Sequence, residues 1–234
     1  MKSISNKTQF MCSLVMSAFL CSTAYAGETN VLTEKSDGSD QSMTAIEQAS
    51  LASQLADYGR DARSAIAFLL AGEIVSSIGA VEAEFTKAGE ASDSKKTEDK
   101  ATGFDFSAEE LFAQARNLAG SNEQLLAAIE VAASKESKGL VGSPATHEDS
   151  VRAGRTDVYT LEYEGGRPAE ILVIGDGDTD LDLTVYDEDD NFICDDDDST
   201  DTMYCEWRPR WTGEFRIEIK NLGDVYNDYV FMTN

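Results

Sequence analysis

The densest group of side chains that could bind a ligand lies between Asp176 and Asp201. This stretch of 26 residues holds twelve Asp and one Glu, and it contains no Lys, Arg or His. Two like charges about 4 Å apart repel by about 1 kcal/mol even in bulk water, so the segment is expected to fold best around a hard divalent cation. The pattern therefore predicts calcium as a cofactor. The alternative is a solvated acidic face that only improves solubility.

The predicted calcium ligands come from two short runs. In a strand, side chains two residues apart share a face, so the acids of the first run would lie together while Leu181 and Leu183 point to the core. The second run would approach from a neighbouring loop. The predicted ligands are Asp178, Asp180, Asp182, Asp195, Asp196 and Asp197. An EF-hand loop is excluded, because its position 6 would be Leu181 rather than Gly and its position 12 would be Asp187 rather than Glu.

Two cysteines flank the second acidic run. Cys194 and Cys205 would be the cysteines of an exported chain, because Cys12 and Cys21 lie in an N-terminal segment that resembles a signal peptide. Disulfides persist outside the cytoplasm, so the pair is predicted to be bonded and to hold the acidic loop between two strands. Such a short closed loop contributes about 3 kcal/mol. A zinc site is the alternative, but neither cysteine has another Cys or His nearby.

One aromatic and basic segment stands out in this acidic chain. Trp207, Arg208, Arg210 and Trp211 surround a single proline. Trp and Arg are favoured at recognition surfaces, so these four residues form a candidate binding surface for a sugar or a peptide. The alternative is that the two Trp side chains help to close the fold while the two Arg side chains pair with nearby carboxylates.

The chain offers few residues for catalysis. His147 is the single histidine, and because no Ser or Cys nucleophile lies near it in sequence, it is interpreted as a solvent-exposed linker residue. No Ser/His/Asp, Cys/His or zinc-helix motif is found. Paired carboxylates could hydrolyse a glycoside, but these acids form a cluster without an evident cleft. We therefore expect a noncatalytic protein, with a carboxylate-dependent hydrolase as the alternative.

The N-terminus is organised like a secretory signal peptide. Residues 1–26 combine two lysines, a mostly apolar stretch at 10–20 and an Ala-x-Ala cleavage site that ends at Ala26. The apolar stretch is about half the roughly 20 residues that a transmembrane helix needs. The mature protein is therefore expected to be periplasmic or secreted, with no membrane insertion after cleavage.

Charge narrows the class of partner. Cleavage would remove two of the 19 basic residues and none of the 44 acidic ones, which takes the formal charge from −25 to −27. Binding to nucleic acid requires clustered Lys and Arg, so nucleic acid is excluded as a partner. The expected partner is a protein or a polysaccharide, and the charge favours basic proteins among the former.

The first part of the mature chain has the pattern of helices. Residues 27–40 are polar and are expected to be disordered. Residues 41–138 are rich in Ala, Leu, Glu and Gln, and they show helical periodicity over 42–58 and from 62 to about 87. The stripe of the second helix would be Ile66, Leu69, Leu70, Ile74 and Ile78. Capping boxes at Ser107 and Ser121 predict two more helices, and thus a four-helix bundle or two helical hairpins.

The second part of the chain has the pattern of strands. After a linker at 139–147, residues 148–234 form short alternating runs between Gly-rich turns. Phe215 and Ile217 alternate with charged residues, as in an antiparallel strand with one solvated face. The predicted fold class is α+β, in which the helices precede a C-terminal antiparallel β-sandwich of jelly-roll type.

Several motifs in this second part resemble the bacterial pre-peptidase C-terminal domain, over about residues 150–234. They are GDGDTDLDL at 175–183, Tyr186-Asp187, WRPRWTGEF at 207–215, KNLGDVYN at 220–227 and Tyr229. The helical part resembles no family. The chain departs from the family in two ways, because it has no peptidase domain and because Asp189-Asp190-Asn191 replaces a Gly-containing turn.

The resemblance implies a noncatalytic jelly-roll-like sandwich that often binds calcium and that assists secretion or substrate attachment in exported proteins. Together with the composition, it leads us to expect a noncatalytic exported protein whose acidic, calcium-stabilised sandwich serves binding, attachment, secretion or stability. The alternative function that the resemblance implies is that of an accessory or inhibitory partner of a separately encoded secreted peptidase.

Overall fold

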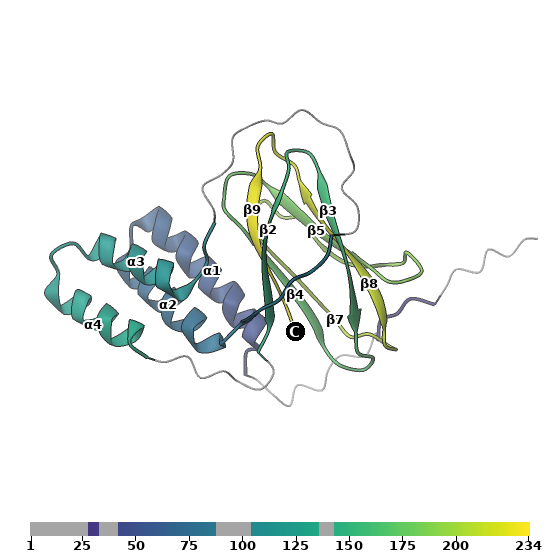
Figure 1. Ribbon diagram of the computed structural model, residues 1–234, viewed down its shortest axis with the longest axis horizontal. Coiled ribbons are helices and arrows are strands. Elements are labelled where there is room, and N and C mark those ends of the chain that lie inside the picture. Colours follow the sequence, from purple (N-terminus) through teal and green to yellow (C-terminus); the bar gives the residue numbers. More distant parts are fainter. Residues whose placement is uncertain (1–27, 33–41, 88–103, 136–142) are drawn as a thin grey trace, which may run out of the picture.

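The computed structural model describes residues 28–32, 42–87, 104–135 and 143–234, and it arranges them in three layers. Helices form one layer, and two β-sheets packed face to face form the other two (Figure 1). The predicted α+β class, with helices followed by an antiparallel sandwich, is confirmed. The predicted signal peptide at 1–26, most of the segment at 27–40 and the start of the linker at 139–147 lie outside the described residues.

The helices begin at caps that their own sequences supply. They are α1 (Ala45–Ala62), α2 (Ala65–Ile78), α3 (Ala108–Ala119) and α4 (Glu123–Ala133). Ser107 caps α3 as predicted, because its side chain accepts the amide of Glu110. The cap of α4 is Asn122, which accepts the amide of Leu125, and not Ser121 one residue earlier. None of the helices in the described part of the chain is long and apolar enough to cross a bilayer.

The second helix is shorter than its predicted range of 62 to about 87. It ends at Ile78 because Gly79 takes a left-handed conformation with φ 64°. The predicted stripe is also wrong in part, since Ile66 is 58% exposed and Leu70 is 44% exposed. The buried face of α2 carries small residues together with Phe68 and with Ile78, which belongs to the predicted stripe.

Glycines on α1 and α2 allow the helices to pack closely. A Cβ atom on Gly59 would lie 2.8 Å from the ring of Phe68, and one on Gly72 would lie 2.7 Å from the ring of Phe112. Each glycine therefore leaves the space that an aromatic ring of the next helix fills. Large rings set against small residues replace the broad apolar stripe that the periodicity predicts.

The sandwich consists of two sheets. The described strands are β1 (Val81–Glu82), β2 (Ala145–Val151), β3 (Thr156–Tyr163), β4 (Ala169–Gly175), β5 (Leu181–Tyr186), β6 (Phe192–Asp196), β7 (Thr202–Trp207), β8 (Gly213–Asn221) and β9 (Asn227–Thr233). One sheet has the order β1-β2-β9-β4-β7, and the other has the order β3-β8-β5-β6. All pairings are antiparallel except that of β1 with β2.

The helical layer and the first sheet share a hydrophobic core. Every residue of β4 is buried, and its side chains alternate between the two faces of the sheet. Leu172 and Ile174 pack with the helices, whereas Ile171 and Val173 pack between the sheets. Helix α1 contacts β4 and β7, and Figure 1 shows it beside the sandwich. The first sheet is therefore covered on both faces.

A strap, residues 81–87, crosses from the helices to the sandwich. Its β1 part adds to the edge of the first sheet beside β2, and Lys87 then makes an antiparallel bridge with Tyr159 on β3 of the other sheet. The strap thus pairs with strands of the sandwich, although the sequence pattern places it in the helical range 41–138.

Two further segments differ from their predicted states. Strand β2 begins at Ala145, so the last residues of the predicted linker at 139–147 are part of a sheet. Asn30 lies in the range predicted to be disordered, yet it is fully buried against the sandwich. In both segments, hydrogen bonds to the sandwich satisfy polar groups that the sequence pattern assigns to solvent.

Candidate functional site

Three of the predicted calcium ligands, Asp180, Asp195 and Asp197, lie close enough to a fourth, Asp182, for their charges to raise its pKa. Asp182 is on β5, and Asp195 is on the neighbouring edge strand β6. Burial raises the pKa of Asp182; Lys220 opposes this rise, and the charges of Asp180, Asp197 and Asp195 add to it. The charges of these three acids therefore oppose the ionisation of Asp182.

The remaining two predicted ligands, Asp178 and Asp196, form hydrogen bonds with residues outside the predicted set. Asp196 accepts the amide of Tyr204 at 2.8 Å, and the amide of Asp178 donates to the side chain of Asp176 at 3.0 Å. Among the described residues, no group of three or more His, Cys, Asp or Glu side chains is placed to hold a metal ion. The six acids do not share one focus in this arrangement, and calcium remains a prediction.

The predicted disulfide between Cys194 and Cys205 is present, and it joins the two sheets. Cys194 lies on β6 at the edge of one sheet, and Cys205 lies on β7 at the edge of the other. The hydrogen bond from Tyr204 to Asp196 links the same two strands. The acidic turn between β6 and β7 is therefore fixed at its base.

Trp207, the first residue of the predicted binding surface, lies inside the sandwich. It is 5% exposed, and its ring contacts Tyr163 and Phe215. Arg208 donates to the carbonyl of Gly166 at 3.0 Å. Both side chains therefore help to close this end of the fold.

The N-terminal residues 28–32 lie against the rest of that surface. The side-chain oxygen of Asn30 accepts the amides of Arg210 at 2.9 Å and of Trp211 at 3.1 Å. The guanidinium of Arg210 also pairs with Glu28. These contacts agree with the alternative interpretation, in which the aromatic and basic segment closes the fold.

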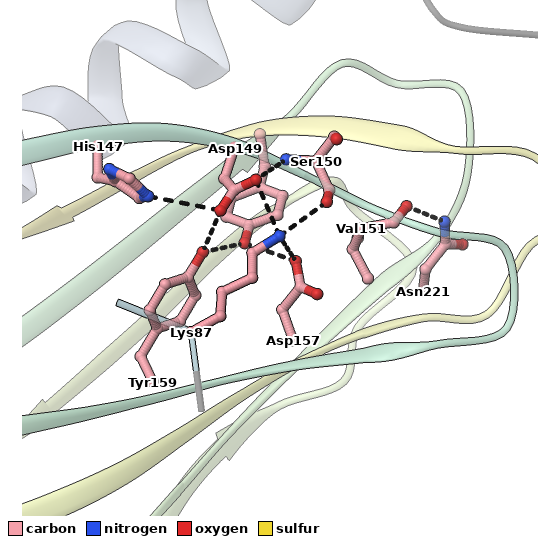
Figure 2. Close-up of polar contacts among 9 residues, drawn as sticks. Lys87, His147, Asp149, Ser150, Val151, Asp157, Tyr159 and Asn221 are labelled. Atoms are coloured by element: carbon pink, nitrogen blue, oxygen red, sulfur yellow. Dashed lines mark hydrogen bonds and ion pairs between the residues drawn. The ribbon is translucent and has the colours of Figure 1, made fainter. Parts of the chain in front are cut away.

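A polar cluster between the edges of the two sheets centres on Lys87 (Figure 2). Its ammonium nitrogen lies 2.8 Å from a carboxylate oxygen of Asp149 on β2 and 2.8 Å from one of Asp157 on β3. It also donates to the carbonyl of Ser150 at 3.0 Å. An ammonium group has three hydrogens, so these contacts can use all of its donors.

Two tyrosine hydroxyls complete the Lys87 cluster. Tyr159 donates to Asp149 and Tyr229 donates to Asp157, both at 2.9 Å, and the two hydroxyl oxygens are 2.5 Å apart. Burial is the main reason that the pKa of each tyrosine is raised, so both remain protonated donors.

The pKa values of the two carboxylates in this cluster are shifted in opposite directions. Burial raises the pKa of Asp157, and hydrogen bonds from Lys87 and Tyr229 offset the rise only in part. Burial also acts on Asp149, but the hydrogen bonds from Lys87, the Ser150 amide and Tyr159 outweigh it and lower the pKa of Asp149. Asp149 is thus the stronger acid of the two, although both lie 2.8 Å from Lys87.

His147 borders the Lys87 cluster, so its interpretation as an exposed linker residue is wrong. Its side chain is 15% exposed, and Nε2 lies 3.5 Å from a carboxylate oxygen of Asp149. Nδ1 lies 3.1 Å from the carbonyl of Ala83 in the strap, and the ring meets Phe85 and Tyr159 edge-on. The histidine helps to seat the strap on β2.

An acidic groove lies where α1 meets the turn between β6 and β7. Its volume is about 590 Å³, which is within the range of small-ligand sites. The residues that line it are Met43, Glu47, Ser50, Leu51, Gln54, Asp57, Asp196, Asp198, Thr200, Thr202 and Tyr204. Four of these described lining residues are acidic and none is Lys or Arg. Hydrogen bonds from Thr200 lower the pKa of Asp198, so this carboxylate is ionised at neutral pH.

Side chains behind the acidic groove fix α1 to the sandwich. The hydroxyls of Thr44 and Tyr204 donate to the same oxygen of Glu170 at 2.8 and 2.7 Å. The hydroxyls of Ser53 and Thr202 lie 2.6 Å apart. Burial raises the pKa of Glu170, which is 3% exposed. One signal in the sequence points to this junction, namely an acidic residue inside the otherwise apolar strand β4.

The comparisons with known proteins find similarity only among solved structures, since no family model and no curated protein matches the chain. The pre-peptidase C-terminal domain of a collagenase from Bacillus anthracis is 17% identical, with 38% of this chain and 87% of that chain covered and a TM-score of 0.34. Aeromonas hydrophila PliG, a periplasmic lysozyme inhibitor of g-type lysozyme, is 14% identical, with 39% and 84% covered and a TM-score of 0.31. A de novo designed double-stranded β-helix is 11% identical, with 38% and 97% covered and a TM-score of 0.26.

The first of these structures belongs to the family whose motifs the second part of this chain resembles. At such identities and scores, the similarity concerns part of the fold and assigns no activity, ligand or partner.

Proposed function

We propose that this chain is a noncatalytic exported protein that binds a basic protein partner through its acidic surface. The observation that carries the proposal is the acidic groove, in which Glu47, Asp57, Asp196 and Asp198 surround an open volume without a Lys or Arg among the described lining residues. Such a surface attracts cationic partners and accelerates their association.

Four buried or partly buried carboxylates outside the acidic groove support a structural role for part of the acidic groups. Asp149 and Asp157 hold the strap through Lys87, and Glu170 holds α1. Asp187 is 2% exposed and accepts the amides of Asn30 and Asn191. Each of these acids joins segments that are distant in sequence or closes a turn, as expected of a scaffold that presents a binding surface.

The binding proposal is tested by affinity capture from the exported fraction of the producing cell. The immobilised protein should bind a basic protein in a saturable manner. This partner should elute when the salt concentration is raised from about 0.05 to 0.5 M, because screening weakens charge pairing. A secreted peptidase among the retained proteins would identify the accessory or inhibitory version of this function. Turnover of peptide or glycoside substrates, lost on replacing one acidic pair, would instead establish the hydrolase alternative.

Calcium is proposed as the stabilising ion of the acidic edge. The support is the effect of the charges of Asp180, Asp195 and Asp197 on Asp182, which a cation bound beside Asp182 would offset. The melting temperature should rise by several degrees in calcium relative to chelator, because an ion that binds only the folded state stabilises it. Asp197→Asn should reduce this rise, whereas Asp224→Asn, at an exposed acid outside the predicted set, should not. An unchanged melting temperature in calcium contradicts the site.

A further inference from the structure

We propose that the acidic groove binds an extended segment of a protein in which Arg or Lys residues alternate with apolar residues. This inference rests on the proposed function and specifies where the basic partner binds and which of its features are recognised. The occupant is a continuous stretch of chain, and neither a free cation nor a folded surface without such a stretch meets the same requirements.

The length of the groove favours an extended segment. Five lining residues of α1, namely Glu47, Ser50, Leu51, Gln54 and Asp57, recur at intervals of one or three residues and so lie on one face of the helix. Glu47 and Asp57 are ten residues apart, which corresponds to about 15 Å along the axis. An extended chain covers about 3.3 Å per residue, so roughly four or five residues would span this face.

The charge of the groove favours a basic segment. Glu47 and Asp57 lie on the α1 side, where Asp57 pairs with Arg60 just outside the lining. Glu47 also accepts the amide of Thr44 at 2.7 Å. Asp196 and Asp198 lie at the β6–β7 turn. A segment between these sides would meet carboxylates on both. Arg or Lys side chains can pair with these carboxylates, whereas acidic side chains would be repelled.

The apolar part of the lining favours alternation with apolar side chains. Met43 is 45% exposed and Leu51 is 38% exposed in the groove, and the ring of Tyr204 lines it as well. Because alternate side chains of an extended segment point in opposite directions, one set can cover this apolar surface while the other reaches the acids. A polyamine or a metal ion would leave the apolar surface in water.

The groove is held in shape before any ligand arrives. On one side, the hydroxyls of Ser53 and Thr202 join α1 to β7, and Thr44 and Tyr204 meet on Glu170. On the other side, the disulfide links β6 to β7 beneath the turn. A site that is already ordered loses little conformational entropy on binding, which favours recognition of a flexible segment.

The test uses the full protein, in chelator, with a fluorescent heptapeptide that alternates Leu and Arg. The peptide should bind in a 1:1 ratio. Leu51→Lys, which places a cation in the groove, should weaken binding at least tenfold. The matched control is Val131→Lys, which makes the same change at a 63% exposed apolar residue of α4 and should leave affinity within twofold. Asp198→Asn should weaken binding more than Asp189→Asn, at an exposed acid outside the groove.

Peptide controls separate the parts of the proposal. Replacing Leu by Ser in the peptide should weaken binding, and replacing Arg by Glu should abolish it. Equal effects of Leu51→Lys and Val131→Lys would overturn the groove assignment, as would equal affinity for the Ser peptide. Self-association of the protein that Leu51→Lys abolishes would identify a second copy as the occupant and also overturn it. If a captured basic partner still binds the Leu51→Lys protein, the proposed function stands and the groove assignment fails.

Discussion

Lys87 links three parts of the molecule through a single side chain. It comes from the strap, and its ammonium group meets Asp149 on one sheet and Asp157 on the other. These three side chains are only 14 to 27% exposed, so their charges lie in an environment that screens them weakly. Removal of the cation would leave two partly buried carboxylates facing each other.

Lys87→Met is expected to lower the free energy of unfolding by about 3 kcal/mol, because breaking one partner of a buried ion pair leaves an uncompensated charge. Urea denaturation at pH 7 measures the change. Lys135→Met is the control, since its pair with Glu73 is exposed and should contribute less than about 1 kcal/mol. Similar losses for the two variants would show that the Lys87 cluster is not a main fastening of the strap.

Asp201 gives the molecule a measurable pH dependence. Its pKa is raised from 3.8 to about 6, first by burial and then by the charge of Asp176, although the Gly177 amide and Asn227 donate to it. One of its oxygens is buried without a hydrogen-bond partner among the described residues. A carboxylate whose pKa is raised on folding stabilises the fold fully below about pH 3.8, and this contribution is lost as the pH rises through about 6.

Asp201→Asn should therefore gain stability relative to the parent protein, by about 2 to 3 kcal/mol, as the pH rises from about 4 to 7. Urea midpoints across this range measure the difference, and the other acids cancel because both proteins carry them. Asp198→Asn should show the opposite trend, since the pKa of Asp198 is lowered. A flat difference curve for Asp201→Asn would contradict the burial of its charge.

At the residue scale, the sequence predicts chemistry best where the partners are near in the chain. Cys194 and Cys205 are 11 residues apart, and the predicted export of the chain is enough to predict their bond. Lys87 and Asp149 are 62 residues apart in the sequence. Lys87 stands at the end of a helical pattern, and nothing in that pattern indicates that its side chain pairs with carboxylates at the edges of two sheets. The hydrogen bond between Asn30 and Trp211 was not predictable either, because these two residues are also far apart in the sequence.

Helix packing, at the scale of elements, depends on glycines that open space for rings. In an exposed helix, replacing Gly by Ala stabilises by about 1 kcal/mol. Gly72 is different, because a Cβ atom there would lie 2.7 Å from the ring of Phe112. The intrinsic gain and the steric cost thus act in opposite directions at this position.

Gly72→Ala is expected to destabilise the protein by about 1 to 3 kcal/mol, since overpacking forces the ring or the helix to move. Thermal melting followed by circular dichroism measures the loss. In a Phe112→Leu background the same substitution should cost less, because Leu lacks the outer ring atoms. If the cost is equal in both backgrounds, the clash with the ring is not its cause.

Element types were predictable here, whereas their environment was only partly so. The helical spacing of apolar residues and the cap at Ser107 predict α3 correctly. The alternation of apolar and charged residues predicts β8. Strand β4 carries a further signal, because its apolar run from Ile171 to Ile174 does not alternate. Such a run is typical of a strand buried on both faces, and it predicts a layer over the outer face of the sheet. The predicted division into a helical part and a sandwich joined by a linker does not use this signal.

The whole molecule is organised around that doubly covered sheet. Leu172 and Ile174 belong to the same core as Ile46 and Phe68 of the helices, so helical and strand residues bury each other. The strap and the residues around Glu170 add polar fastenings across the same boundary. Composition divides the chain near residue 140, but packing does not, because each half lacks part of its core without the other.

A shared core predicts that the helices and the sandwich unfold together. The two Trp residues, Trp207 and Trp211, both lie in the sandwich and report its unfolding by fluorescence, while circular dichroism at 222 nm reports mainly the helices. In urea, the two signals should change at the same midpoint in the parent protein. Leu172→Ala should lower both midpoints equally, because the cavity that forms at the junction reduces the free energy of unfolding by about 2 to 5 kcal/mol. Val131→Ala, at an exposed position of α4, should change neither midpoint appreciably. If the signal at 222 nm is lost before the fluorescence changes, the helices form an independent unit, and the junction beneath the acidic groove is too weak to hold its two sides in place.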